Sequence, residues 1–136
     1  MNNRFRFLVG FTIIAIFLLA CAISAVAPPA FAAKPANPTA WIATWGGKWT
    51  NLRQVRFIVQ KVEGGKAEVV YEWEASPLDR VPDRGKREWV LEFIDENTLV
   101  KASGSTPLKF TLSPDASEIR LTEVNNPTHF AVLKKK

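Results

Sequence analysis

The chain is poor in the side chains from which most catalytic and metal sites are built. Its 136 residues include one cysteine, one histidine, one tyrosine and one methionine. A single thiol cannot close a disulfide within the chain, and a lone imidazole cannot form a zinc-binding cluster. A Ser-His-Asp triad would need His129, yet the sequence has no Gly-x-Ser-x-Gly elbow. We therefore expect no catalytic residue, no metal site, no cofactor and no enzymatic activity.

Neither sign of charge dominates the sequence. The formal net charge is +5, and without residues 1–32, which contain Arg4 and Arg6 but no acid, it becomes +3. Three of the remaining positive charges are the final residues, Lys134 to Lys136. The rest of the chain is close to neutral, which predicts no nucleic-acid partner.

The long hydrophobic run lies at the N-terminus. It spans Phe7 to Val26, follows two arginines, and ends before the small-x-small sequence Ala30-Phe31-Ala32. This order of features is typical of a signal helix with a cleavage site before Ala33. We therefore predict a signal peptide over 1–32 and an extracytoplasmic protein, either periplasmic or secreted.

Two alternatives for this segment stay open. About twenty apolar residues are enough to span a bilayer, so the segment is long enough for an uncleaved membrane anchor. The sequence Leu18-Leu19-Ala20-Cys21 resembles the lipobox of bacterial lipoproteins, which implies a lipid on Cys21 and anchoring at that residue. In each case, contact with a membrane is expected only through this segment or a lipid at Cys21.

The rest of the chain is predicted to form a linker over 33–40 and one domain over 41–136. Hydrophobic residues alternate with polar ones over 52–62 and 66–74, which indicates half-buried strands. A three-residue loop, Glu63 to Gly65, would place Phe57 opposite Tyr71. The same register sets Val55 against Trp73 and Arg56 against Glu72. No segment after residue 33 has the pattern of an amphipathic helix.

Further hairpins are predicted downstream. A two-residue turn at Glu96-Asn97 would pair Phe93 with Val100 and Glu92 with Lys101. A four-residue turn over 114–117 would pair Leu112 with Ile119 and Phe110 with Leu121. A loop over 125–127 leads to a last strand, 129–133, in which His129 faces Glu123. The alternation places the acidic residues of these strands on the outer face. There we expect them to form solvated ion pairs with basic residues of neighbouring strands, and not a pair of catalytic acids like that of a glycosidase.

These strands predict an all-β fold. Seven or eight short strands joined mostly by tight turns form an antiparallel up-and-down meander. With no helix to cover its apolar face or its edges, the sheet is expected to close into a small barrel of about eight strands. A β-sandwich is the alternative, because turns alone do not distinguish a curled meander from a folded one.

One segment carries a resemblance to a known family. The segment 45–49 (WGGKW) contains Gly47-x-Trp49, which resembles the signature that opens the first strand of lipocalins and related calycins. Together with the strand 69–73 (VVYEW), it is similar to small lipocalin-like domains of exported bacterial proteins. The resemblance implies an up-and-down barrel that holds small apolar ligands, and it implies no catalytic residues.

The interior of such a barrel is the candidate site. We expect an exported, non-enzymatic binding module whose aromatic lining takes a small apolar or amphipathic ligand. The loop 75–87 could supply cations for an anionic head group, and His129 could supply a polar anchor. The alternative is a structural or protein- or glycan-interaction domain with a packed core. The predicted ligand-binding residues are Phe57, Tyr71, Trp73, Trp89, Phe93, Phe110, Arg80, Arg84 and His129.

Overall fold

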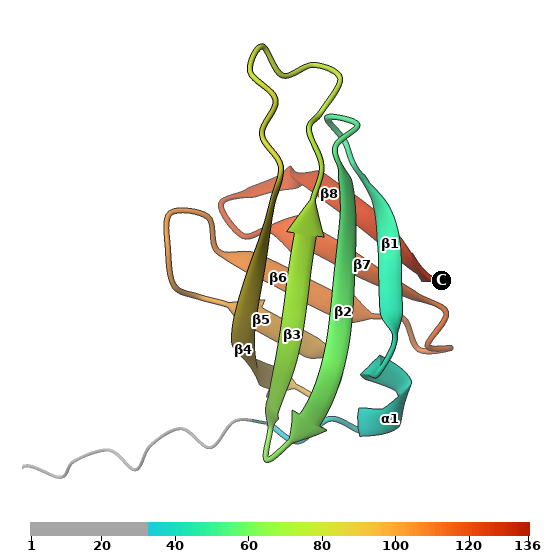
Figure 1. Cartoon of the computed structure of the whole chain (residues 1–136). Coiled ribbons are helices and arrows are strands. Elements are labelled where there is room, and N and C mark those ends of the chain that lie inside the picture. Colours follow the sequence, from blue (N-terminus) through green and yellow to red (C-terminus); the bar gives the residue numbers. More distant parts are fainter. Residues whose placement is uncertain (1–32) are drawn as a thin grey trace, which may run out of the picture.

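The computed structural model describes residues 33–136, so the predicted signal peptide, anchor and lipid site at Cys21 lie outside the described residues. Eight strands follow one short helix (Figure 1). Within the described part, no helix is long and apolar enough to span a bilayer. The elements are α1 (Pro38–Trp41), β1 (Thr44–Trp49), β2 (Gln54–Glu63), β3 (Lys66–Trp73), β4 (Gly85–Asp95), β5 (Thr98–Lys101), β6 (Leu108–Leu112), β7 (Glu118–Glu123) and β8 (Asn126–Lys135).

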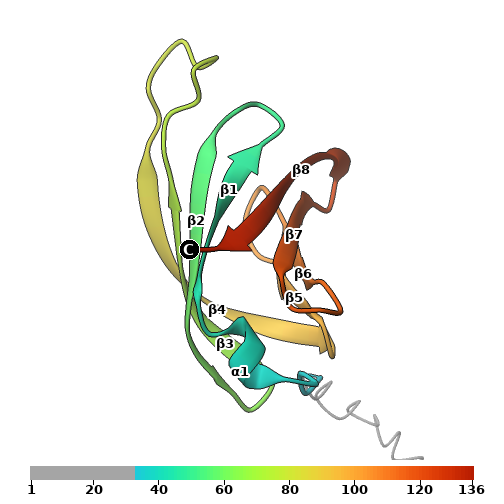
Figure 2. The same cartoon turned by 90° about the vertical axis from the view of Figure 1, so that its right-hand side faces the viewer.

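The strands form a closed antiparallel barrel in sequence order, which confirms the predicted all-β meander. Each strand pairs with the next, and β1 closes the ring by pairing with β8, with Gly47 opposite Leu133. Figures 1 and 2 show β1–β4 and β5–β8 wrapping around one common interior. The structure is therefore a barrel and not the alternative β-sandwich.

Segment 33–40, predicted as a linker, lies against one end of the barrel. The N–H of Ala33 donates to the carbonyl of Phe93 over 2.9 Å, and the N–H of Ala36 donates to that of Glu96 over 3.2 Å. Asn37 caps the short helix α1 by accepting from the N–H of Ala40. This one turn of helix has no amphipathic period, and the sequence pattern did not predict it.

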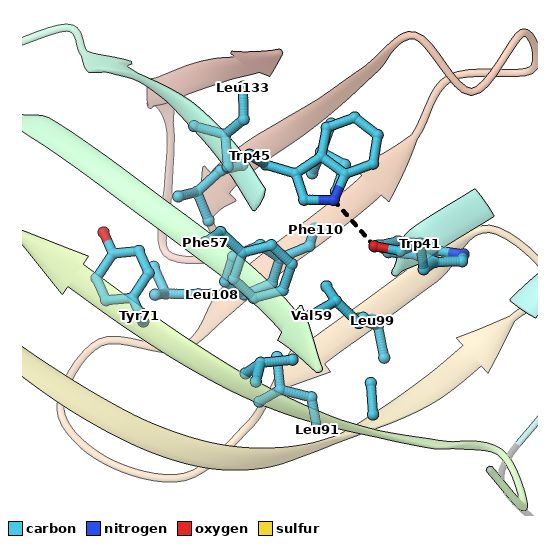
Figure 3. Close-up of a cluster of buried hydrophobic side chains, with 14 of the residues drawn as sticks. Trp41, Trp45, Phe57, Val59, Tyr71, Leu91, Leu99, Leu108, Phe110 and Leu133 are labelled. Atoms are coloured by element: carbon cyan, nitrogen blue, oxygen red, sulfur yellow. Dashed lines mark hydrogen bonds between the residues drawn. The ribbon is translucent and has the colours of Figure 1, made fainter. Parts of the chain in front are cut away.

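Trp41, at the end of α1, closes this end of the barrel. Its ring is fully buried and packs edge-on against Phe93, with 5.3 Å between the ring centroids. Its carbonyl accepts from the indole N–H of Trp45 over 3.0 Å (Figure 3). Phe57 and Phe110 stack at 4.2 Å in the middle of the barrel, and neither is exposed. The closed end and the centre are therefore filled with side chains.

The register of the β2–β3 hairpin is as predicted, but its turn is not. Phe57 lies opposite Tyr71, yet the turn is a two-residue Gly64-Gly65 turn with φ of 59° and 75°. Two adjacent positive φ angles favour glycine and match a hairpin turn of the primed type. The register shifts by one residue between Val59 and Lys61, which compensates for the shorter loop. The predicted three-residue loop is therefore wrong.

The β4–β5 register is also corrected. The turn at Glu96-Asn97 has two residues as predicted, but the register shifts between Phe93 and Asp95. Phe93 therefore faces Leu99, and Glu92 faces Val100 instead of Lys101. This bulge brings Leu99, which is fully buried, into the core.

The last two hairpins follow the predicted pairing in their regular parts. Leu112 faces Ile119 and Phe110 faces Leu121. In the β7–β8 pair, the predicted loop over 125–127 is wrong, because the turn has two residues, 124–125, and β8 begins at Asn126 opposite Glu123. The register then shifts between Thr122 and Glu123. The register of the regular part still brings His129 to Glu123, whose carboxylate lies 3.9 Å from the imidazole Nε2.

A candidate ligand site at the barrel mouth

The end of the barrel opposite α1 is open and holds a pocket of about 500 Å³. Its walls come from the ends of β1, β3, β5 and β7, from the first halves of β4, β6 and β8, and from the intervening loops. Aromatic rings meet charged side chains here, which is the arrangement that favours amphipathic ligands. The lining residues that carry the argument below are Trp49, Tyr71, Trp73, Trp89, Arg87 and Lys101.

The floor of the mouth is a group of packed rings. The phenol oxygen of Tyr71 accepts from the indole N–H of Trp49 over 2.9 Å. The ring of Tyr71 stacks on Trp89 at 5.0 Å and lies 5.9 Å from Trp73. Burial raises the pKa of Tyr71 to about 12, with the hydrogen bond from Trp49 acting in the opposite direction. The phenol is therefore neutral at physiological pH.

His129 covers Trp49 from the side of β8. The two rings are nearly parallel, with centroids 4.5 Å apart. The imidazole Nδ1 lies 2.7 Å from the hydroxyl oxygen of Thr50, and Nε2 faces Glu123. The contact with Thr50 orients the imidazole, and its ring packs over Trp49 at the mouth.

One arginine fastens the long loop between β3 and β4 to the mouth. Arg53 binds Asp79 at 2.8 Å and Asp83 at 2.9 Å through its two terminal nitrogens. The hydrogen bond with Asp83 raises the pKa of Arg53, and the same bond lowers the pKa of Asp83. Asp79 also accepts from the N–H of Ser76. The charge of Arg53 is therefore already compensated by the loop.

Two other cations at the mouth form no ion pair with a carboxylate of residues 33–136. The guanidinium of Arg87 lies 5.9 Å from the centre of the Trp73 ring. The ammonium of Lys101 lies 5.3 Å from the centre of the Trp89 ring and donates to the carbonyls of Ser103 and Thr106. Asp83 and Glu123 also line the pocket, but Asp83 is bound to Arg53 and Glu123 faces His129. Arg87 and Lys101 are therefore the cations there that could meet an anionic group of a ligand.

The predicted ligand-binding residues divide into three groups. Tyr71, Trp73, Trp89 and His129 line the mouth, as expected of a binding site. Phe57, Phe93 and Phe110 are at most 1% exposed and lie in the filled core, so they are out of reach of a ligand at the mouth. The two predicted loop cations lie elsewhere: Arg84 lines a groove on the outer face of the sheet, and Arg80 is exposed in the loop.

Lys101 was placed outside by the sequence pattern, and the structure turns it inward. The bulge in β4 shifts the β4–β5 register by one residue, so Lys101 lies on the face of Leu99 and opposite Leu108. The external partner of Glu92 is Lys66, at 3.5 Å. Arg53 was likewise missed, because a charge at the start of a strand carries no periodic signal.

Comparisons with protein-family models, with curated proteins and with solved structures found no match.

Proposed function

We propose that this chain is an exported, non-enzymatic, lipocalin-like module that binds a small amphipathic molecule at the barrel mouth. The aromatic or apolar part of the ligand would lie against Trp73 and Trp89, and an anionic group would lie near Arg87 and Lys101. The observation that carries the proposal is a pocket lined with aromatic rings in which Arg87 and Lys101 have no carboxylate partner among residues 33–136.

The location of the ligand follows from packing. The centre of the barrel is occupied by stacked Phe57 and Phe110, and Trp41 closes the far end. A ligand therefore rests on the ring group at the mouth instead of entering a deep cavity. A shallow site of this kind suits a small planar molecule with one charged end.

Export and family are parts of the same proposal. Export is supported by residues 1–32, in which two arginines are followed by an apolar run and then by a small-x-small sequence. A lipoprotein anchored at Cys21 and an uncleaved membrane anchor are the alternatives to a cleaved signal peptide. The support for a lipocalin-like module is the Gly47-x-Trp49 triplet on the first strand of a closed eight-stranded meander. Trp49 is the residue of that triplet that lies across the mouth.

Two fluorescent probes test the proposal directly. Anilinonaphthalene sulfonate has an aromatic body and an anionic group, and N-phenylnaphthylamine has the same ring system without the charge. We expect saturable binding of the sulfonate, weakened about tenfold by Arg87→Gln or Lys101→Met, because each removes one charge-assisted contact. Binding of the uncharged probe should change little in either variant.

A matched control is Lys109→Met, which removes a cation from the outer face of β6. This variant should bind both probes as the parent protein does. Equal losses in Lys109→Met and Arg87→Gln would show that only the overall charge matters. Failure of the folded parent protein to bind either probe would refute the mouth as a ligand site.

A second candidate function is a structural or protein-interaction domain, and the filled core favours it. It does not gain support from a surface cluster of tryptophans, because Trp41 and Trp45 are both fully buried. Under this second function the probes find no site at the mouth, so the same titration separates the two candidates.

A further inference from the structure

The seam between β4 and β5 is paired along only part of its length. β4 pairs with β3 from Gly85 to Glu92, but it pairs with β5 only from Glu92 onward. After β5 the chain turns away and reaches β6 through a wide loop, 102–107 (Figure 1). The first half of β4 therefore has a strand on one side only, although the barrel is closed elsewhere.

The alternation of backbone hydrogen bonds along β4 shows which N–H and C=O groups point to this free edge. The N–H of Phe93 donates to the carbonyl of Gly65 at the end of the β3–β4 pair. In an antiparallel pair, successive residues direct their N–H and C=O groups to opposite sides. Odd-numbered residues of β4 thus bond to β3, and Lys86, Glu88 and Val90 direct their backbone groups to the free edge.

The backbone groups of these three residues have almost no partners within residues 33–136. The one contact is a long bond of 3.4 Å from the guanidinium of Arg87 to the carbonyl of Lys86. A groove of about 440 Å³ runs beside this edge and is lined by Glu88, Val90 and Ala102 among others. A row of open donors and acceptors beside a groove is the template for an added strand.

The side chains on the outer face of this edge specify what would pair with it. Val90 is 64% exposed, and Ile94, further along the same face, is 60% exposed. Glu88 and Lys86 are exposed and form no ion pair with residues of the described part. Side chains opposite each other on one face of a sheet interact by charge and by apolar contact. Lys86, Glu88 and Val90 would therefore each favour a particular kind of residue on an added strand.

We propose that the edge of β4 from Lys86 to Val90 binds an extended peptide segment of a partner protein by strand addition. The segment runs antiparallel to β4 and carries an apolar, a basic and an acidic residue at alternate positions. These face Val90, Glu88 and Lys86 in that order. The edge adjoins the barrel mouth, because Arg87 and Trp89 of the same segment line the mouth pocket. The strand-addition site is nevertheless argued from backbone groups and outer side chains of β4, so it does not depend on the proposed small-molecule function.

Two synthetic peptides of identical composition test the proposal. The probe is acetyl-Thr-Val-Thr-Lys-Thr-Glu-Thr-amide, and its control exchanges the lysine and the glutamate. In an NMR titration we expect the probe to shift the amides of Lys86, Glu88 and Val90 saturably. The control should bind about five- to tenfold more weakly, because both charge pairs become repulsive.

A pair of variants at one position tests whether the backbone carries the binding. Proline at position 88 removes an N–H that points to the free edge and that the β3–β4 pairing does not use. Glu88→Pro should abolish binding of the probe, whereas Glu88→Ala, which keeps the N–H, should weaken it only a few-fold. The indole signal of Trp49 reports that each variant is folded.

A test on the peptide side covers the case in which Glu88→Pro does not fold. N-methylation of the peptide amides that point toward β4 should abolish binding. N-methylation of the alternate amides, which point away from β4, should leave binding intact. The proposal is overturned if the amides of Lys86, Glu88 and Val90 do not respond to the probe. It is overturned also if the two peptides bind equally, or if N-methylation has the same effect at all positions.

Discussion

The closure of the barrel depends on one position without a side chain, Gly47. This residue lies in β1 between β2 and β8, opposite Val55 and Leu133. A Cβ atom at position 47 would lie 2.2 Å from the carbonyl oxygen of Val132 and 2.9 Å from the Cδ2 of Leu133. The first of these atoms belongs to the backbone of β8, so it cannot rotate away. Gly47→Ala therefore forces β1 and β8 apart where they close the ring.

The expected cost follows from the size of that displacement. Relief of the contact requires β8 to move by about 1 Å, and overpacking of this kind costs roughly 1–3 kcal/mol. The lower flexibility of alanine in the unfolded chain offsets part of the cost. We expect Gly47→Ala to lower the free energy of unfolding by about 2 kcal/mol, which corresponds to a fall in Tm of roughly 10 °C for a domain of this size.

The neighbouring glycine supplies the control. A Cβ at Gly46 would lie 2.4 Å from the Cε of Lys136, the end of a flexible side chain that can move aside. Gly46→Ala should therefore change stability by less than about 0.5 kcal/mol. Urea unfolding followed by tryptophan fluorescence measures both variants. Equal effects of the two substitutions, or a Gly47→Ala protein as stable as the parent, would refute the close approach of β1 and β8.

Three further predictions concern the mouth and the turns. Burial raises the pKa of Tyr71 from 10.0 to about 12, so the neutral phenol favours the folded state. Its contribution to stability is complete below pH 10, and roughly 2–3 kcal/mol of it is lost between pH 10 and 12. Ultraviolet absorbance of the only tyrosine gives the pKa, and the free energy of unfolding at each pH gives the loss. Arg53→Gln should make the loop between β3 and β4 more sensitive to limited proteolysis, because the partly exposed arginine binds both Asp79 and Asp83 of that loop. Tm should fall by only a few degrees, and an unchanged cleavage rate would contradict this role. Hydrogen bonds from Ser113 and Ser117 lower the pKa of Asp115 to about 2. The contribution of this carboxylate to folding stability is therefore present above pH 4 and is lost as the pH falls toward 2. Ser113→Ala should raise the pKa of Asp115, measured by NMR titration of its carboxyl group.

The sequence predicted the fold because its dominant signal is the alternation of side chains between two faces. Once Phe57, Tyr71 and Phe110 are assigned to one face, a one-residue error in register would expose all of them, so few registers are compatible. The same argument could not predict the bulges near Gln60 and Ile94. A bulge adds one residue without changing the composition of a strand, and it therefore leaves little trace in the hydrophobic pattern.

The candidate site was predicted less well for the same physical reason. Tyr71, Trp73 and Trp89 were placed on the inner face correctly, but periodicity does not show how far along the axis a filled core ends and an open mouth begins. Phe57 and Phe93 share that face and lie below the mouth. The inward position of Lys101 depends on the bulge in β4, so the hydrophobic pattern of the sequence could not predict it.

The short helix at the closed end also fixes how the domain is presented. Ala33 is bonded beside Phe93, at the end that Trp41 closes, while Arg87 and Lys101 stand at the other end. The described part of the chain therefore begins at the closed end of the barrel. The open mouth, with Arg87 and Lys101, lies at the end farthest from that point.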